Sequence, residues 1–238
     1  MEEKQPIVLD MHYALFGFDN GLGRPDHAAD RLREEMPGVF DGMPTMLPQV
    51  EGFPGSDDIP IVHLSSTGPV SVDIARGRAD FHIAGRGRQT VAQVAMDLLG
   101  YIGHFHRVFA EQRPQRVGFV VRVFYESDEP VAYGERLLST GFFGTIPGVV
   151  ETLAIRHAAR LVYHGLGINS VTVVDTGTVA NIAGESTRVG GIQVTRDFNN
   201  VPGQIVDPTV EAAPDFVHFG LDSLALEGLE LLLWPKTK

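Results

Sequence analysis

Residues 80–99, DFHIAGRGRQTVAQVAMDLL, are predicted to form the end of a strand, a Gly-Arg turn and the start of a helix. The other elements of the first half are assigned relative to this strand and helix. The helix is predicted over 89–111, because apolar residues recur there at three- and four-residue spacing. Such spacing places one apolar stripe on a helix, and we expect this stripe to pack against a sheet. The stripe consists of Val91, Val94, Ala95, Leu98, Ile102, Phe105 and Phe109.

The segments on either side of this stretch predict an antiparallel sheet with two helices on one face. A β-rich segment (6–18) is followed by a helix that begins at Pro25 and ends before Pro37. Three short β segments, IPIVHLSS, PVSVDI and ADFHIA, then form a meander. After the long helix, residues 115–127 (QRVGFVVRVFYES) alternate apolar and polar side chains. This order predicts a ferredoxin-like plan with an extra hairpin strand for residues 1–127.

The second half is predicted to be a β-meander covered by a C-terminal helix. Residues 128–148 are expected to form a linker with a short helix. Residues 149–238 then carry three long β segments and a final helix, predicted at 149–164, 169–179, 188–201 and 214–232. The two halves form either two units or one continuous domain. In both cases the predicted fold class is α+β, with antiparallel sheets backed by helices.

The composition indicates a soluble globular protein. Of the 238 residues, 43% are apolar and 21% are charged, which is ordinary for a globular domain. Because cysteine is missing, the chain has no disulfides, thiolate zinc ligands or cysteine nucleophile. The N-terminal residues MEEKQPIVLD lack the basic and apolar regions of a signal peptide, so a cytoplasmic location is expected. A net charge of −11 disfavours general binding to nucleic acids.

Five segments carry a recognisable layout: PIVLDMHYALF, RLREEMPGVF, GPVSVDIARGRADFHI, RVGFVVRVFYES and GGIQVTRDFN. With these segments in this order, the chain resembles a sporadically distributed family of uncharacterised bacterial proteins of about this length. The resemblance covers most of the chain and implies a shared order of strands and helices. It implies no established activity and supplies no catalytic residues.

The Gly-Arg turn is a candidate site for an anion or a partner. Gly85 and Gly87 tolerate a left-handed backbone, and the amides at the start of the following helix point outward. Arg86 and Arg88 add guanidinium groups, which bind carboxylates and phosphates. A solvated loop at the start of the helix is the alternative, since a lone Gly-x-Gly is a weak motif.

Four further arginines on three predicted strands are candidates for a polar concavity. Arg156 and Arg160 alternate onto one face of their strand, and Arg122 and Arg196 lie on two other strands. If these strands pair suitably, the four side chains would bind an acidic ligand or an acidic segment of a partner. A solvated face of an antiparallel sheet is the alternative.

The histidines predict no metal centre. His104 and His106 are two residues apart on the predicted long helix and point in different directions, whereas a shared ion needs a spacing of four. His157, on the apolar face of its strand, is expected to be a hydrogen-bonded core residue. His63 and His82 are candidates for cross-strand neighbours in the meander.

The sequence leaves three function hypotheses open. The first is a non-catalytic binding or assembly module that acts through a sheet face or edge, either as a homo-oligomer or with a protein partner. It is favoured because GxSxG, SxxK, HExxH and cofactor fingerprints are missing, so no catalytic residue or cofactor is predicted. The second is an enzyme or sensor that binds a small anionic ligand between the arginines. The third is nucleic-acid binding through the Gly-Arg turn.

Overall fold

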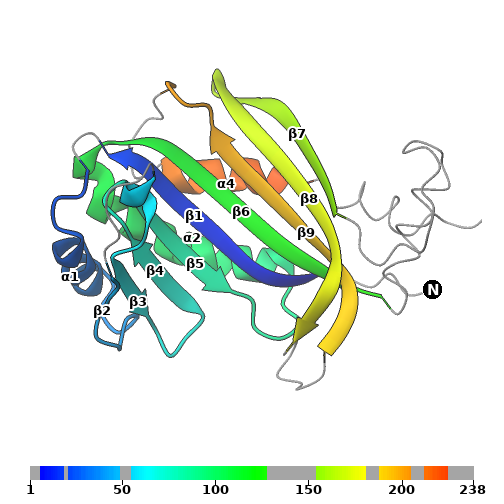
Figure 1. Ribbon diagram of the computed structural model, residues 1–238, viewed down its shortest axis with the longest axis horizontal. Coiled ribbons are helices and arrows are strands. Elements are labelled where there is room, and N and C mark those ends of the chain that lie inside the picture. Colours follow the sequence, from blue (N-terminus) through cyan, green and yellow to red (C-terminus); the bar gives the residue numbers. More distant parts are fainter. Residues whose placement is uncertain are drawn as a thin grey trace, which may run out of the picture.

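The computed structural model describes residues 6–18, 21–48, 55–127, 154–180, 188–204 and 212–224. Their strands form one antiparallel sheet of nine strands, in the order β2-β3-β4-β5-β1-β6-β9-β8-β7 (Figure 1). The strands are β1 (Ile7–Phe18), β2 (Thr45–Met46), β3 (Val62–Ser65), β4 (Val70–Ile74), β5 (Arg78–Ala84), β6 (Pro114–Glu126), β7 (Ala154–Tyr163), β8 (Leu166–Ala180) and β9 (Arg188–Asn200). The predicted α+β class with an antiparallel sheet is confirmed.

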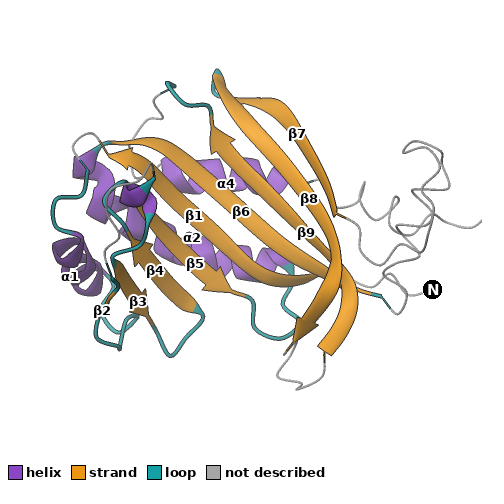
Figure 2. Ribbon diagram, viewed as in Figure 1, coloured by secondary structure: helices purple, strands orange, loops and turns teal. Residues whose placement is uncertain are grey.

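The α-helices of the described residues lie on one face of the sheet. They are α1 (Pro25–Glu35), α2 (Val91–Phe109) and α4 (Ala212–Asp222), and two short 3-10 helices, η1 (Ser56–Asp58) and η2 (Ala110–Gln112), lie in connections. Figure 2 shows α2 and α4 behind the sheet, and α1 packs against α2, β3 and β4. The opposite face, which no described α-helix covers, is called the open face below. No helix within the described ranges is both long and apolar enough to cross a membrane.

Helix α2 forms where its apolar stripe predicts it, and its start is fixed by a capping box. The Thr90 hydroxyl accepts a hydrogen bond from the Gln93 N–H, and the Gln93 side chain accepts one from the Thr90 N–H. Phe105 is fully buried and its ring contacts those of Tyr13 and Phe81. The stripe therefore packs on β1 and β5, as predicted, and closes the main core.

Strand β6 joins the two predicted halves of the chain. Its alternating side chains are each at most 3% exposed, as the pattern predicts: Val117, Phe119, Val121, Val123 and Tyr125. One edge of β6 pairs with β1 and the other with β9, so both halves belong to one continuous sheet. The predicted linker 128–148 lies outside the described residues. The last predicted helix is observed over 212–222 as α4, and the part of it beyond 224 also lies outside them.

Strand β7 ends the sheet and is largely exposed on both of its faces. His157 and Ala159, predicted to face a core, are exposed, so the expectation that His157 is a core histidine is wrong. The reason is the position of α4. The aromatic rings of α4 that contact β7 are those of Phe216 and Phe219, and both pack against Tyr163 near the end of the strand. No described helix covers the rest of β7.

Candidate functional site

The Gly-Arg turn is held by contacts within the chain. Arg88 donates to both carboxylate oxygens of Glu126 (3.2 and 2.9 Å), and the Arg86 backbone N–H donates to Gln89 Oε1 (2.6 Å). Gly85 lies so close to β1 that an added Cβ would be 1.9 Å from the Val8 carbonyl oxygen. Backbone packing therefore requires this glycine, and one of the two candidate arginines is already paired. The Arg86 side chain is exposed.

Arg196 lies on the helix-covered face of the sheet, because its register with Val121 places both side chains on that side. Its guanidinium donates to Thr172 Oγ1 and to the Ser223 carbonyl oxygen at 2.7 Å each, and it lies 5.6 Å from the centre of the Phe198 ring. Burial lowers the pKa of Arg196 from its ordinary value. These contacts connect β8 and β9 to the end of α4.

The other three arginines of the predicted concavity lie on the open face, but they are not gathered there. Arg122 on β6 donates to Asp10 Oδ1 (2.9 Å) and is partly neutralised by it. Arg156 and Arg160 lie on β7, and β9 and β8 separate them from β6. With Arg196 on the opposite face, the four side chains do not form the predicted concavity. Arg156 and Arg160 remain together as a pair on the edge strand.

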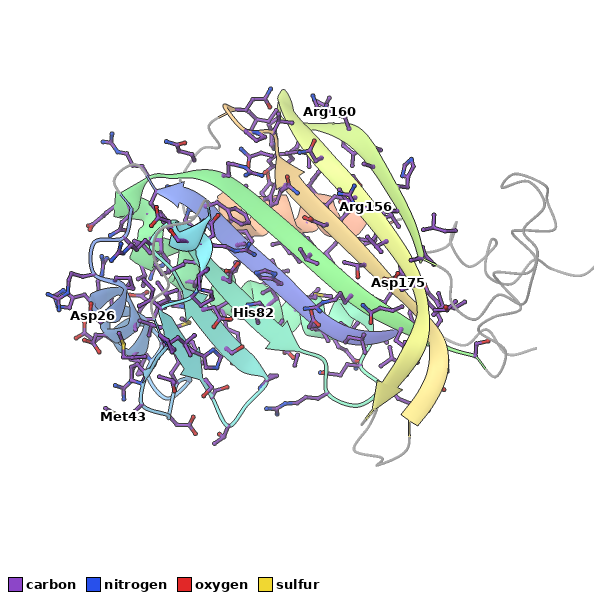
Figure 3. The ribbon with its side chains drawn as sticks, in the orientation of Figure 1. Asp26, Met43, His82, Arg156, Arg160 and Asp175 are labelled. Atoms are coloured by element: carbon purple, nitrogen blue, oxygen red, sulfur yellow. The ribbon has the colours of Figure 1, made fainter. Side chains whose placement is uncertain are left out.

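A cluster of ionisable side chains, marked by no sequence motif, lies on the open face of four neighbouring strands. We call it the histidine–aspartate cluster. Its members are His12 (β1), His63 (β3), Asp73 (β4), Arg78, Asp80 and His82 (β5). Figure 3 labels His82 in the middle of the sheet.

The centre of this cluster is a pair of stacked histidines on β1 and β5. His12 and His82 are opposite each other in the register, with ring centroids 4.1 Å apart and planes inclined by 18°. Asp80 accepts hydrogen bonds from His12 Nε2 (2.7 Å) and from Arg78 Nε (2.7 Å to each oxygen). Burial lowers the pKa of His12 from its ordinary value of 6.5, although the hydrogen bond to Asp80 acts in the opposite direction.

Asp73 links the other two histidines. His63 Nδ1 donates to Asp73 Oδ1 (2.8 Å), and His82 Nε2 lies 3.4 Å from Asp73 Oδ2. The interactions with His82 and then His63 lower the pKa of Asp73 from its ordinary value. The candidate pairing of His63 and His82 as cross-strand neighbours is wrong, because β4 lies between their strands and its Asp73 joins them.

The arrangement suits proton exchange better than metal binding. Each imidazole directs one ring nitrogen at a carboxylate, which leaves the other nitrogen as an acceptor in the neutral form. The stacked rings of His12 and His82 are nearly parallel, so their in-plane lone pairs do not converge on one ion. Across the described ranges, no group of three His, Cys, Asp or Glu side chains could hold a metal ion. The proximity of His82 adds to the effect of burial in lowering the pKa of His12.

His104 and His106 point in different directions, as predicted, and have separate structural partners. His104 Nδ1 lies 2.9 Å from Glu35 Oε1 on α1, and Arg107 also donates to Glu35. His106 is buried, and its Nδ1 lies 3.1 Å from the Tyr13 hydroxyl oxygen. These contacts join α2 to α1 and to β1.

The two edges of the sheet differ in length. Strand β2 has two residues, whereas β7 has ten and pairs with β8 in an unbroken register from Ala154 to Tyr163. β7 contains no proline, and its register with β8 contains no bulge. Short strands, prolines, bulges and charged side chains are the usual protection of a sheet edge. Of these, β7 has only the charges of Arg156 and Arg160, so its backbone stays accessible to another strand whose side chains suit these charges.

Every second residue of β7 directs its backbone N–H and C=O away from β8. Gly167, opposite Val162, accepts a hydrogen bond from the Val201 N–H on the other side of its strand (3.0 Å). Bonded and non-bonded residue pairs alternate along antiparallel strands, so the same orientation recurs at every second position. The residues of β7 with outward backbone groups are therefore Ala154, Arg156, Ala158, Arg160 and Val162. Among the described strands, none pairs with this outer side of β7.

Comparison of the chain with protein-family models, with curated proteins and with solved structures found no match. The family resemblance therefore stays a prediction, and the function has to be inferred from the geometry of the chain itself.

Proposed function

We propose that the chain is a non-catalytic binding module that accepts an extended segment of a partner at the edge strand β7. One observation carries the proposal: β7 is a regular, exposed ten-residue edge whose outward backbone groups pair with no other described strand. A partner strand would extend the sheet through main-chain hydrogen bonds, and the side chains of β7 would select among partners.

The proposal is tested by selecting random nonapeptides that bind the full chain. We expect the selected peptides to lose binding to an Ala158→Pro variant, because proline removes an outward N–H at the middle of β7. Ala158→Val is the matched control, since valine keeps this N–H and is favoured in strands. Thermal unfolding of both variants checks that the fold is kept. Peptides that bind the proline variant as tightly as the valine variant would contradict the proposal.

A second candidate, an enzyme or sensor for a small anionic ligand, is supported by the histidine–aspartate cluster. The side chains of His63, Arg78 and His82 are 36%, 32% and 27% exposed, so a ligand can reach their ring nitrogens and guanidinium. A thermal-shift screen of small carboxylates and phosphates tests this candidate, with His82→Gln as the comparison. Stabilisation of the parent chain alone would support it, and equal shifts for both chains would argue against it.

The hypothesis of nucleic-acid binding through the Gly-Arg turn has less support than these two. Glu126 neutralises Arg88, and the net charge of the chain is −11.

We propose a ferredoxin-like description for the first half of the chain. Its support is the strand order β4-β5-β1-β6, with α1 following β1 and α2 connecting β5 to β6 on the same face. Strands β2 and β3 then extend this unit beyond β4.

A further inference from the structure

We infer that the segment accepted by β7 is acidic, with carboxylates placed beside Arg156 and Arg160. This inference rests on the proposed function of β7 as a strand acceptor. It adds the chemical class of the partner, which the backbone of the edge strand alone does not specify.

Two arginines on the edge strand have no acidic partner among the described residues. Arg156 and Arg160 are exposed, and the hydrogen bond of Arg160 is to the neutral Asn169 Oδ1 (3.4 Å). Figure 3 labels Asp175, which lies opposite Ala154 at the start of the strand. Within the described residues, neither arginine forms an ion pair with this or any other carboxylate.

The spacing of these arginines matches that of alternate side chains on a paired strand. They lie four residues apart on one face of β7, roughly 13 Å at the rise of a strand. Ala158 lies between them, and Val162, which is 72% exposed, follows on the same face. An antiparallel partner would therefore place an acidic side chain opposite each arginine and a small or apolar one opposite Ala158 and Val162.

A second copy of the chain suits this edge less well than an acidic segment does. Two β7 strands can pair antiparallel with their open faces on the same side. In every register from Arg156 opposite Arg156 to Arg160 opposite Arg160, at least one arginine then lies opposite or diagonal to an arginine of the other copy. Like charges in such positions destabilise a strand pair. An acidic segment is instead stabilised at the positions opposite Arg156 and Arg160, because opposite charges attract there. The net charge of −11 does not prevent this contact, because charges beyond about 8 Å are largely screened at physiological salt.

The inference is tested with two labelled peptides, acetylated and amidated, that differ only in charge: VTETVTETV and VTKTVTKTV. In the antiparallel register, their charged residues lie opposite Arg160 and Arg156. We expect the glutamate peptide to bind the full chain about tenfold more tightly than the lysine peptide at about 0.15 M salt, measured by fluorescence anisotropy. The difference should shrink at 0.5 M salt.

A variant with both Arg156→Glu and Arg160→Glu should reverse this preference and bind the lysine peptide more tightly. Because both side chains are exposed, the variant is expected to fold, and circular dichroism checks this. Reversal would support the inference.

Other outcomes would overturn it in distinguishable ways. If both peptides bind equally and Ala158→Pro abolishes both, β7 is a strand acceptor but its partner is not acidic. If neither peptide binds and the chain self-associates in sedimentation experiments in a way that Ala158→Pro prevents, the occupant is a second copy. If neither binding nor self-association is found, the proposed function fails together with the inference.

Discussion

Strands β6 and β7 have the same kind of sequence but opposite environments. Both alternate side chains at every second position, and those of β6 are at most 3% exposed. On the corresponding face of β7 none is buried: Ile155, Leu161 and Tyr163 are partly exposed, and His157 and Ala159 are exposed. The difference lies in what covers each strand. β6 is flanked by β1 and β9 and covered by α4, whereas β7 has one neighbouring strand and touches α4 near one end. Alternation therefore predicts a strand, but its place in the sheet decides burial.

The largest loss of stability is expected from a substitution in the core between α2 and the sheet. Phe105→Ala should lower the free energy of unfolding by about 3–5 kcal/mol, because Phe105 is fully buried against Tyr13 and Phe81. Urea unfolding measures this loss. Met96→Ala on the same helix is the control, because Met96 is 73% exposed and its loss should cost less than about 0.5 kcal/mol. A loss below about 1 kcal/mol for Phe105→Ala would mean that the covered half is not closely packed.

The second largest loss of stability is expected from a substitution in the histidine–aspartate cluster on the open face. Asp80→Asn should lower the free energy of unfolding by about 2 kcal/mol, because the charged acceptor of Arg78 and His12 is removed from a side chain that is 8% exposed. Urea unfolding again gives the value. Asp97→Asn on the exposed side of α2 should change stability little. Equal losses for the two variants would show that the cluster adds no stability.

A smaller change in the free energy of unfolding is expected when the pH is lowered. Because burial lowers the pKa of His12 below 6.5, the unfolded chain binds more protons than the native chain as the pH falls below about that value. The contribution of neutral His12 to stability is therefore fully present above pH 6.5 and is lost as the pH falls toward the pKa of His12 in the native chain. Asp73 acts in the same direction, but only below its ordinary pKa of 3.8. Unfolding between pH 7.5 and 5.5 should show a shallower slope in His12→Gln, and an unchanged slope would contradict this assignment.

The smallest change in stability is expected from substitutions in the edge strand β7. Replacing Arg156 and Arg160 together by alanine should shift the Tm by less than about 2 °C, because both are exposed and neither forms an ion pair among the described residues. Differential scanning calorimetry measures the shift. A decrease of several degrees would mean that these arginines stabilise the fold, and the contrast between β6 and β7 would weaken.

The sequence predicts those parts of the fold that depend on local periodicity. The stripe through Phe105 and the alternation around Phe119 each identified an element and its buried face, because one segment contains the whole signal. The exposure of His157 was not predictable in this way, since it depends on where α4 packs.

The histidine–aspartate cluster was missed for a related reason. His12 and His82 meet only in one register of β1 and β5, and a shift of one residue would turn His12 to the opposite face. A partial signal was present, because polar residues alternate with apolar ones in VSVDI and RADFHI. Arg196 was grouped with Arg156 because the faces of separate strands cannot be related without their register.

The most direct test of β7 as a strand acceptor is residue-resolved amide hydrogen exchange on the isolated full chain. Our account predicts fast exchange at Arg156, Ala158, Arg160 and Val162, and protection at His157, Ala159 and Leu161, which bond to β8. Addition of the glutamate peptide should then slow exchange at the first set and leave the second unchanged. Protection of both sets in the free chain at low concentration, or no change with the peptide, would contradict the account.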